Sequence, residues 1–352
     1  MPYPRYVADP SKLDRALERI ARAVLDYRVE FLFGAGMSKT SKVPTGYALT
    51  LRFLSQFYPP AGQKHPSPKS LKRMALDFPL EAIAEVVERM PGKGRADLTK
   101  RLTDALFDDL KPELSAHDVF LSICSWDGSP RVNRLFTTNF DTLLEQAFGD
   151  KAVSITADNF PEMRDAQRPG NSIIPIIHLH GTLDATYKIT ETDVFDSTYD
   201  PTAAVFRAAL AEADAFVFVG YSMSDPDFRS LYMSHRDAIQ GRRRGTSTED
   251  KTTYVVGPAR DPFHYELGTE VWAGRGAVWF PLDARTFFEE LRLFLEHGSG
   301  STMLKTLKKS YKLQDEGVFR QKVDRIGQTL CLDPGDAMAF MMQVRKRSGG
   351  KR

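Results

Sequence analysis

Short apolar runs alternate along the chain with longer segments in which apolar residues recur at helical spacing. Asp9-Pro10 has the form of an N-cap followed by proline at the first helical position, and the apolar period behind it predicts a helix over residues 10–26. The next run, residues 29–33, is short, apolar and closed by glycine. That pattern predicts a buried strand.

The same rhythm continues to about residue 297. Further apolar runs predict strands at residues 131–137, 152–156, 173–179, 215–220, 253–257 and 277–281. Helical periodicity predicts helices at residues 46–57, 70–90 with an interruption at Pro79, 95–110, 116–124, 140–148, 201–213, 225–240 and 284–296. Strands separated by helices predict right-handed βαβ units.

The expected fold class is therefore α/β: a doubly wound, Rossmann-like, mainly parallel sheet with a helical insert and a C-terminal helical extension. We expect residues 1–297 to form the main domain, with the insert at about 46–125. A Gly/Ser-rich linker follows at 298–302, and the extension occupies 298–352. In such a sheet, ligands bind beyond the carboxyl ends of the strands, where the strand order reverses.

Composition narrows the class of protein. With 352 residues, 42% hydrophobic and 27% charged, the chain is of ordinary globular composition. Its apolar runs fall short of the ~18 residues that cross a bilayer, and the start has no signal-peptide pattern, so we expect a cytoplasmic protein without a membrane partner. Only Cys124 and Cys331 are present, which excludes a disulfide scaffold and a four-cysteine zinc module.

Charge is unevenly distributed. The net charge is +2, but residues 298–352 carry twelve Lys/Arg against five Asp/Glu. Such a segment can meet a polyanion or an acidic protein face, and it can equally be an ordinary solvated helical surface. Direct binding of nucleic acid by this extension is left open.

The first polar turn, Gly34-Ala35-Gly36-Met37-Ser38, follows the strand at 29–33. Glycines permit a tight turn and a close approach of the backbone, so successive amides can point at a phosphate, and the Ser38 hydroxyl can add a donor. The same glycines can serve only to turn the chain.

The second turn contains Asn139 and Asp141 at the end of the next strand. Asp141 is well placed to cap the following helix. Asn139, between the strand and the cap, can present an amide donor and a carbonyl acceptor to a ligand.

The third turn contains His178, His180 and Gly181. Two histidines two residues apart could ligate a metal, but no Cys, Glu or third His stands at a familiar spacing. His180, nearer the strand end, is the better general base, because imidazole works near its own pKa of about 6.5. His178 is expected to be a packed or hydrogen-bonded support residue.

The fourth turn begins at Gly220, after the strand at 215–220. Ser222 or Ser224 could donate to a phosphate or a ribose. Ser224 or Asp225 could equally cap a helix ahead of Pro226.

Together and in this order, the four turns resemble the motifs of the sirtuin superfamily. GAGMS (34–38) is similar to the family's GAGxS, TTNFD (137–141) to TQNxD, LHG (179–181) to its catalytic HG, and GYS (220–222) to its late G-[ST]-S turn. The resemblance covers about residues 28–297.

Two departures from the family pattern bear on the reaction. Sirtuin deacylases place four zinc-binding cysteines after HG, whereas residues 182–214 contain no cysteine. The GIPDFR segment is also altered, because residues 43–47 read VPTGY. Both weaken a deacylase interpretation. TNFDxLLE and GYSxxDPDF instead look like bacterial sirtuin-like proteins of antiphage defence, which hydrolyse NAD⁺.

The resemblance implies NAD⁺ as substrate, without zinc, and an NADase that releases nicotinamide and ADP-ribose and depletes NAD⁺ in antiphage defence. It implies that Asn139 fixes the nicotinamide ribose and a water, and that His180 acts as general base. Residues near Val256-Gly257 would line the adenine. The binding residues that the motifs carry over are Gly34, Ala35, Gly36, Ser38 and Asp141, with Gly220 and Ser222 on the adenosine side.

Two other functions stay open: a protein-lysine deacylase that lacks zinc, and a module that binds NAD⁺ or ADP-ribose without chemistry. Such an NADase needs control, and we expect it from homo-oligomerisation or a partner. The resemblance suggests a HerA-type DNA-translocating ATPase or, second, a short Argonaute module. We favour the ATPase, because no Argonaute-associated domain fits after residue 297.

Overall fold

The computed structural model describes residues 10–39, 41–57, 66–91, 93–107, 113–125, 130–167, 172–196, 200–221, 232–233, 252–259 and 262–297. The predicted linker and basic extension (298–352) and most of the helix predicted at 225–240 lie outside these residues.

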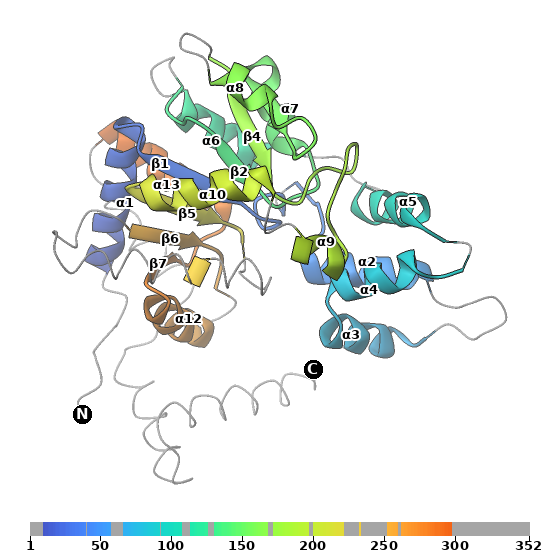
Figure 1. Ribbon diagram of the computed structural model, residues 1–352. Helices are drawn as coiled ribbons and strands as arrows, with labels where there is room; N and C mark the ends of the chain where they lie inside the picture. Colours follow the sequence, from blue (N-terminus) through green and yellow to red (C-terminus); the bar gives the residue numbers. More distant parts are fainter. Residues whose placement is uncertain are drawn as a thin grey trace, which may run out of the picture.

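A seven-stranded parallel sheet forms the centre of the molecule, in the order β3-β4-β2-β1-β5-β6-β7 (Figure 1). Strands β2, β3 and β4 lie on one side of β1, and β5, β6 and β7 lie on its other side, where β5 pairs with β1. This reversal makes the sheet doubly wound and confirms the predicted α/β fold class. The strands are β1 (Val29–Phe33), β2 (Leu135–Thr137), β3 (Ala152–Ile155), β4 (Ile174–His178), β5 (Ala215–Val219), β6 (Thr252–Val256) and β7 (Ala277–Phe280).

Helices cover both faces of the sheet because alternate residues of each buried strand point to opposite sides. Phe31 and Phe33 face Phe120 and Phe288 in one apolar core, whereas Leu32 belongs to the other. The first face carries α1 (Pro10–Leu25), α6 (Ser115–Cys124), α7 (Leu143–Phe148) and α13 (Ala284–His297). The second carries α8 (Glu162–Ala166), α10 (Pro201–Glu212) and α12 (Pro262–Gly274).

A separate group of helices lies at one end of the sheet, between β1 and β2 in sequence (Figure 1). It consists of α2 (Gly46–Phe57), α3 (Pro68–Asp77), α4 (Leu80–Glu88) and α5 (Arg95–Phe107), and α9 (Glu191–Asp196) contacts it through α4. These helices have their own apolar core, which also includes Leu143, Tyr187 and Ile189 of the sheet domain. We call α2–α5 the insert helices. The next helix, α6, packs into the core under the sheet.

The sequence predicted the element boundaries closely, with a few differences. β2 begins at Leu135 rather than at residue 131, and Arg134 instead forms an ion pair with Glu30. The helix predicted from residue 140 begins at Leu143. Within the described residues, three α-helices were not predicted, and neither was the 3-10 helix η1 (Gly149–Lys151). α8 and α9 are too short for a periodic signal, and α12 contains Gly268, which packs against Trp279.

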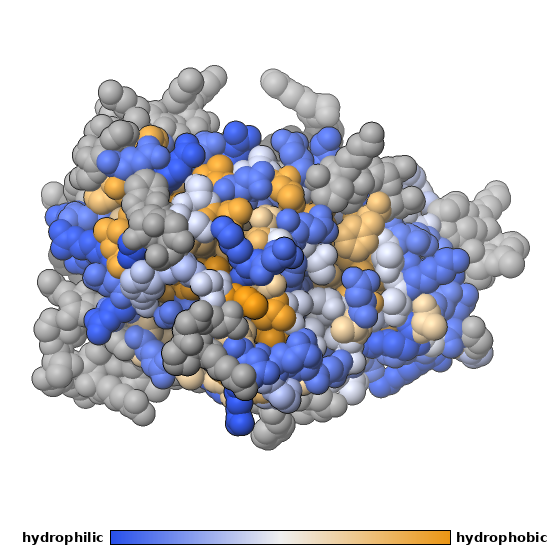
Figure 2. Space-filling view, turned by 90° about the horizontal axis from the view of Figure 1, so that it is seen from above, coloured by the Kyte–Doolittle hydropathy of each residue, from blue (hydrophilic) through white to orange (hydrophobic). Residues whose placement is uncertain are grey.

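Viewed from above the orientation of Figure 1, hydrophobic residues reach the surface near the middle of the face, and the right-hand end is mostly hydrophilic (Figure 2). Among the described helices, none combines the length and the apolar character needed to span a bilayer.

Candidate functional site

The four polar turns leave four neighbouring strands. Phe33 of β1 pairs with Thr137 of β2 on one side and Val219 of β5 on the other, and Thr137 pairs with His178 of β4. Because all four strands are parallel, their turns emerge at the same edge of the sheet. This edge contains the reversal of strand order, where α/β sheets bind ligands.

The first and fourth turns are packed against each other. A Cβ on Gly36 would lie 2.6 Å from the Cα of Gly220, and a Cβ on Gly34 would lie 2.8 Å from the Cα of Tyr221. Gly220 itself has a φ of +67°, a conformation that favours glycine. Glycine at these positions is thus needed for backbone contact between the turns that follow β1 and β5.

Some amides of the first turn are already used within the protein. Gly34 N donates to Val219 O at 2.9 Å, Gly36 N to Gly220 O at 2.9 Å, and Met37 N to Gly34 O at 2.9 Å. The two amides of this turn outside these three bonds are those of Ala35 and Ser38. A phosphate at this turn would therefore be held by fewer amides than the glycine pattern alone predicts.

Ser38, Asn139 and Asp141 form a buried hydrogen-bonded group. The Ser38 hydroxyl donates to Asp141 Oδ2 at 2.9 Å and accepts from Asn139 Nδ2 at 3.1 Å. Ser38 is fully buried, and the two others are less than 10% exposed. The amide of Asn139 is thereby held in one orientation, in which Nδ2 is engaged and Oδ1 remains for other contacts.

Asp141 has a second internal partner, because its Oδ1 accepts from Leu143 N at 3.3 Å near the start of α7. Burial raises the pKa of Asp141, and the hydrogen bonds from Ser38 and Leu143 oppose that rise. Asp141 therefore holds Ser38 and accepts the first amide of α7, although Thr142 rather than the predicted Asp141 occupies the N-cap position of that helix.

His178 is buried and linked to both α7 and the second turn. Its Nε2 lies 2.6 Å from Glu145 Oε1 and its Nδ1 lies 3.2 Å from the main-chain oxygen of Asn139. A carbonyl oxygen can only accept, so Nδ1 carries a proton. The geometry agrees with the support role predicted for this histidine.

His180 lies in the turn beyond β4, and its side chain is partly exposed. Its ring centroid is 6.4 Å from that of Phe140, and its main-chain oxygen accepts from Lys188 N at 2.8 Å. Since Thr137 and His178 are paired, Asn139 and His180 each stand two residues beyond the same rung of the sheet. The two predicted catalytic residues thus leave adjacent strands.

Another buried histidine, His117 of α6, lies near Glu145. Burial lowers the pKa of His117 to about 4, and the charge of Glu145 opposes this. Within the described residues, neither ring nitrogen of His117 has a hydrogen-bond partner. His117 is therefore a neutral core side chain at pH 7.

The remaining predicted positions are distributed as follows. Ser222, with Ser224 and Asp225, lies outside the described residues. Gly257 follows β6, next to β5, and donates its amide to Phe280 O. The sequence did not indicate the roles of two residues in the site. Glu145 is the partner of His178, and the hydroxyl of Thr137 accepts from Asn139 N at 3.0 Å. An acidic residue on a short helix directly after the second turn was the available signal for Glu145.

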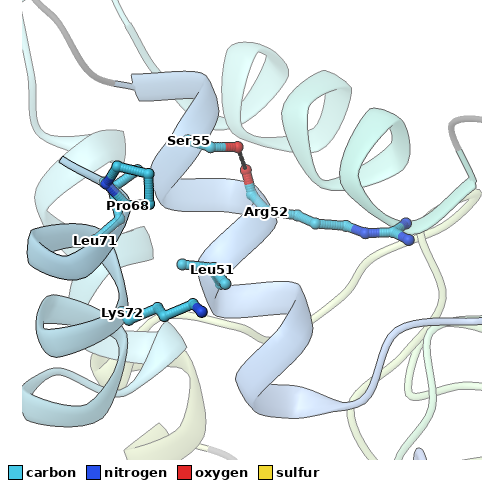
Figure 3. A pocket seen from close by; sticks show the side chains of 6 residues that line it. All are labelled: Leu51, Arg52, Ser55, Pro68, Leu71 and Lys72. Carbon is cyan, nitrogen blue, oxygen red and sulfur yellow. Dashed lines mark hydrogen bonds between the residues drawn. The ribbon is translucent and has the colours of Figure 1, made fainter. Parts of the chain in front are cut away.

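Among the described residues, no group of three or more His, Cys, Asp or Glu could hold a metal ion. A groove of about 230 Å³ lies elsewhere, between α2 and α3 (Figure 3). The guanidinium end of Arg52 extends away from the groove and donates to Ala105 O of α5. The groove is lined by Leu51, Arg52, Ser55, Pro68, Leu71 and Lys72, none of which is a predicted site residue.

Comparison with known proteins adds one sequence match. Residues 133–275, less than half of the chain, match the family model of the SIR2-like domain. This span begins two residues before β2 and ends one residue after α12, and the first turn lies before it. The match supports the sirtuin-superfamily resemblance for this part of the chain. No curated protein matches the chain in sequence.

Two solved structures align along most of the chain. One, from work on the structural basis for the mechanism and regulation of Sir2 enzymes, is 14% identical, with 80% of this chain and 98% of that chain covered and a TM-score of 0.43. The other, a crystal structure of a Sir2 homologue–NAD complex, is 16% identical, with coverages of 80% and 94% and a TM-score of 0.44. Both identities are low, so the fold class rests on the strand order and register described above.

Proposed function

We propose that this protein is an NAD⁺ hydrolase that cleaves the bond between nicotinamide and ribose. The observation that carries the proposal is the buried group at the strand-order reversal, in which Ser38 and Asp141 fix the amide of Asn139. The SIR2-like match over 133–275 and the four turns on neighbouring strands support it.

Cleavage of this bond develops positive charge on the ribose, in an oxocarbenium-like transition state. Asn139 Oδ1, left over from the bond that Nδ2 makes to Ser38, accepts from a ribose hydroxyl or the attacking water. His180, partly exposed beyond β4, acts as general base toward that hydroxyl or water. Ala35 and Ser38 supply the amides for the linking phosphates.

The cysteine content of the sequence favours water over a peptide as the nucleophile. A deacylase of this family builds its acyl-lysine groove beside a four-cysteine zinc module, and the chain has two cysteines in total. Without that groove, water is the remaining nucleophile, and the products are nicotinamide and ADP-ribose. Depletion of NAD⁺ in antiphage defence, controlled by self-association or by a HerA-type ATPase, extends this proposal to the cell.

The test is to incubate the purified full chain with NAD⁺ alone and measure nicotinamide and ADP-ribose. We expect turnover without peptide, and a loss of at least ~100-fold in Asn139→Ala and His180→Ala, the scale of a lost catalytic group. Asn159→Ala is a matched control, because this asparagine bonds within the turn after β3. Unchanged turnover in both site variants would remove them from the mechanism.

Two further outcomes identify the alternatives. Turnover that strictly requires an acyl-lysine peptide supports a deacylase. Binding of ADP-ribose with no product, measured by calorimetry in the presence and absence of the candidate partner, supports a binding module.

A further inference from the structure

The turn that carries His180 is closed by the segment that follows it. Gly181, with a φ of +73°, pairs with Tyr187 in an isolated antiparallel bridge, and Lys188 N donates to His180 O at 2.8 Å. A Cβ on Gly181 would lie 2.0 Å from Thr186 O, so the two stretches are in direct backbone contact. The position of His180 therefore depends on the position of residues 187–188.

Tyr187 is in turn held by α5 of the insert helices. Its side chain is buried, its hydroxyl lies 2.7 Å from Thr99 Oγ1, and the guanidinium of Arg95 lies 4.3 Å from its ring centroid. Phe140 of the second turn also contacts this ring, in an edge-to-face arrangement with 6.1 Å between centroids. Tyr187 thus joins the insert to both catalytic turns.

Arg95 holds the same segment at two points, Tyr187 and Asp193, and also pairs with Glu88 of α4 within the insert. It donates to the main-chain oxygen of Tyr187, and its Nη1 lies 2.8 Å from Asp193 Oδ2 and 3.3 Å from Glu88 Oε2. Asp193 Oδ2 also accepts the amides of Ile189 and Thr190, each at 3.1 Å. One guanidinium therefore ties the main chain of the segment to the insert on both sides of Ile189.

We propose that Arg95 and Tyr187 are positioning residues for His180, and that they make NAD⁺ cleavage depend on how the insert helices sit against the sheet. This inference rests on the proposed function. The insert contacts the sheet domain through one apolar core and through the contacts of Arg95 with Tyr187 and Asp193, which we call the joint. His180 itself lies on a turn. A contact that shifts α5 displaces Tyr187, and the backbone bridge between Tyr187 and Gly181 transmits this displacement to His180.

The experiment compares Arg95→Gln with Arg101→Gln. Arg101 is on the same helix and pairs with Asp97 and the oxygen of Gln56, but these are contacts within the insert. In Arg95→Gln we expect kcat to fall about 10- to 100-fold, the scale of a slightly misplaced catalytic group. KM for NAD⁺ should stay within ~3-fold, because the phosphate contacts are elsewhere. Arg101→Gln should match the wild type.

A second readout needs no activity. Hydrogen exchange of the Lys188 amide, measured without NAD⁺, should be at least ~10-fold faster in Arg95→Gln, since opening of the joint exposes the bond to His180 O. Arg95→Lys retains a charge for Asp193 and should recover part of the protection. Tyr187→Phe and Thr99→Val each remove the same contact between the two hydroxyls. The Lys188 amide should therefore exchange at the same rate in the double variant as in either single variant.

Two outcomes overturn the inference: exchange at Lys188 that is the same in Arg95→Gln and the wild type, or equal effects of the Arg95 and Arg101 substitutions. If the wild type does not cleave NAD⁺ at all, the proposed function fails, while the exchange comparison still decides whether the joint exists.

Discussion

Nε2 of His178 lies 2.6 Å from Oε1 of Glu145, so a histidine at the end of β4 and a glutamate on α7 share a hydrogen bond beneath the second turn. The other ring nitrogen donates to the main-chain oxygen of Asn139. A carboxylate, like a carbonyl, only accepts. Both ring nitrogens of His178 therefore face oxygen acceptors, and Glu145 is the side-chain partner that holds Nε2 in place.

This relationship predicts different results for two substitutions of Glu145. In Glu145→Gln the new NH₂ donates to Nε2 of His178, both contacts of the ring survive, and stability should stay within ~1 kcal/mol of the wild type. Glu145→Leu leaves buried Nε2 without a partner and should lower the free energy of unfolding by about 1–3 kcal/mol. Urea unfolding measures both. Equal losses in the two variants would contradict this account.

Ser38→Ala tests the buried group around Asn139. The substitution removes the acceptor of Asn139 Nδ2 and the donor to Asp141 Oδ2 together. A buried carboxylate oxygen is then unpaired, so we expect a loss of about 1–3 kcal/mol in unfolding free energy and a fall in NAD⁺ turnover. Ser122→Ala, which removes a bond to Val119 O on α6, is the control. A Ser38→Ala protein as stable and active as the control would dismiss the role of Ser38.

Gly36→Ala tests the contact between the first and fourth turns. The added methyl would lie 2.6 Å from Gly220 Cα and 2.8 Å from Gly220 O, and these backbone atoms cannot move without shifting β5. We expect a loss of about 1–3 kcal/mol and a lower affinity for NAD⁺, measured by thermal unfolding and calorimetry. Gly46→Ala is the matched control, because its Cβ would meet open space. Wild-type behaviour of Gly36→Ala would mean that the turns separate freely.

His117 predicts a pH dependence of stability. Its pKa is lowered by burial from 6.5 to about 4 in the folded protein, so the unfolded chain takes up the proton first as the pH falls. Stability is therefore lost between pH 6.5 and 4, by about 3 kcal/mol in total at 1.36 kcal/mol per pKa unit. His117→Leu should remove this loss and cost little at pH 7. Parallel pH profiles of the wild type and the variant, from chemical unfolding, would refute this assignment.

Much of the fold could be predicted because the elements carry strong local signals. The run at 29–33 and the helix at 46–57 have the predicted bounds, and Pro79 separates α3 from α4 as expected. The strand ends could then be placed at one edge of the sheet, since parallel strands share their carboxyl edge.

The partners within the site could not be predicted in the same way. Glu145 meets His178 only because α7 packs against the sheet beside β3, next to β4, and Arg95 meets Asp193 only because α9 contacts α4 of the insert. These pairs are distant in sequence, and α9 is six residues long, so no period or motif marks them. Two of the three bonds made by amides of the first turn, to Val219 O and Gly220 O, likewise depend on contact with the end of β5, which the glycine pattern alone does not describe.

The central place of β1 in the sheet also shapes how the chain folds. Leu32 pairs with Phe136, and Val29 pairs with Ala215. Both partners are synthesised long after β1, with all the insert helices in between. A nascent chain must therefore carry an unpaired, mostly apolar strand for much of translation, and high contact order makes the final pairing slow. Newly made protein should accordingly depend on chaperones that shield the first strand until the fifth has emerged.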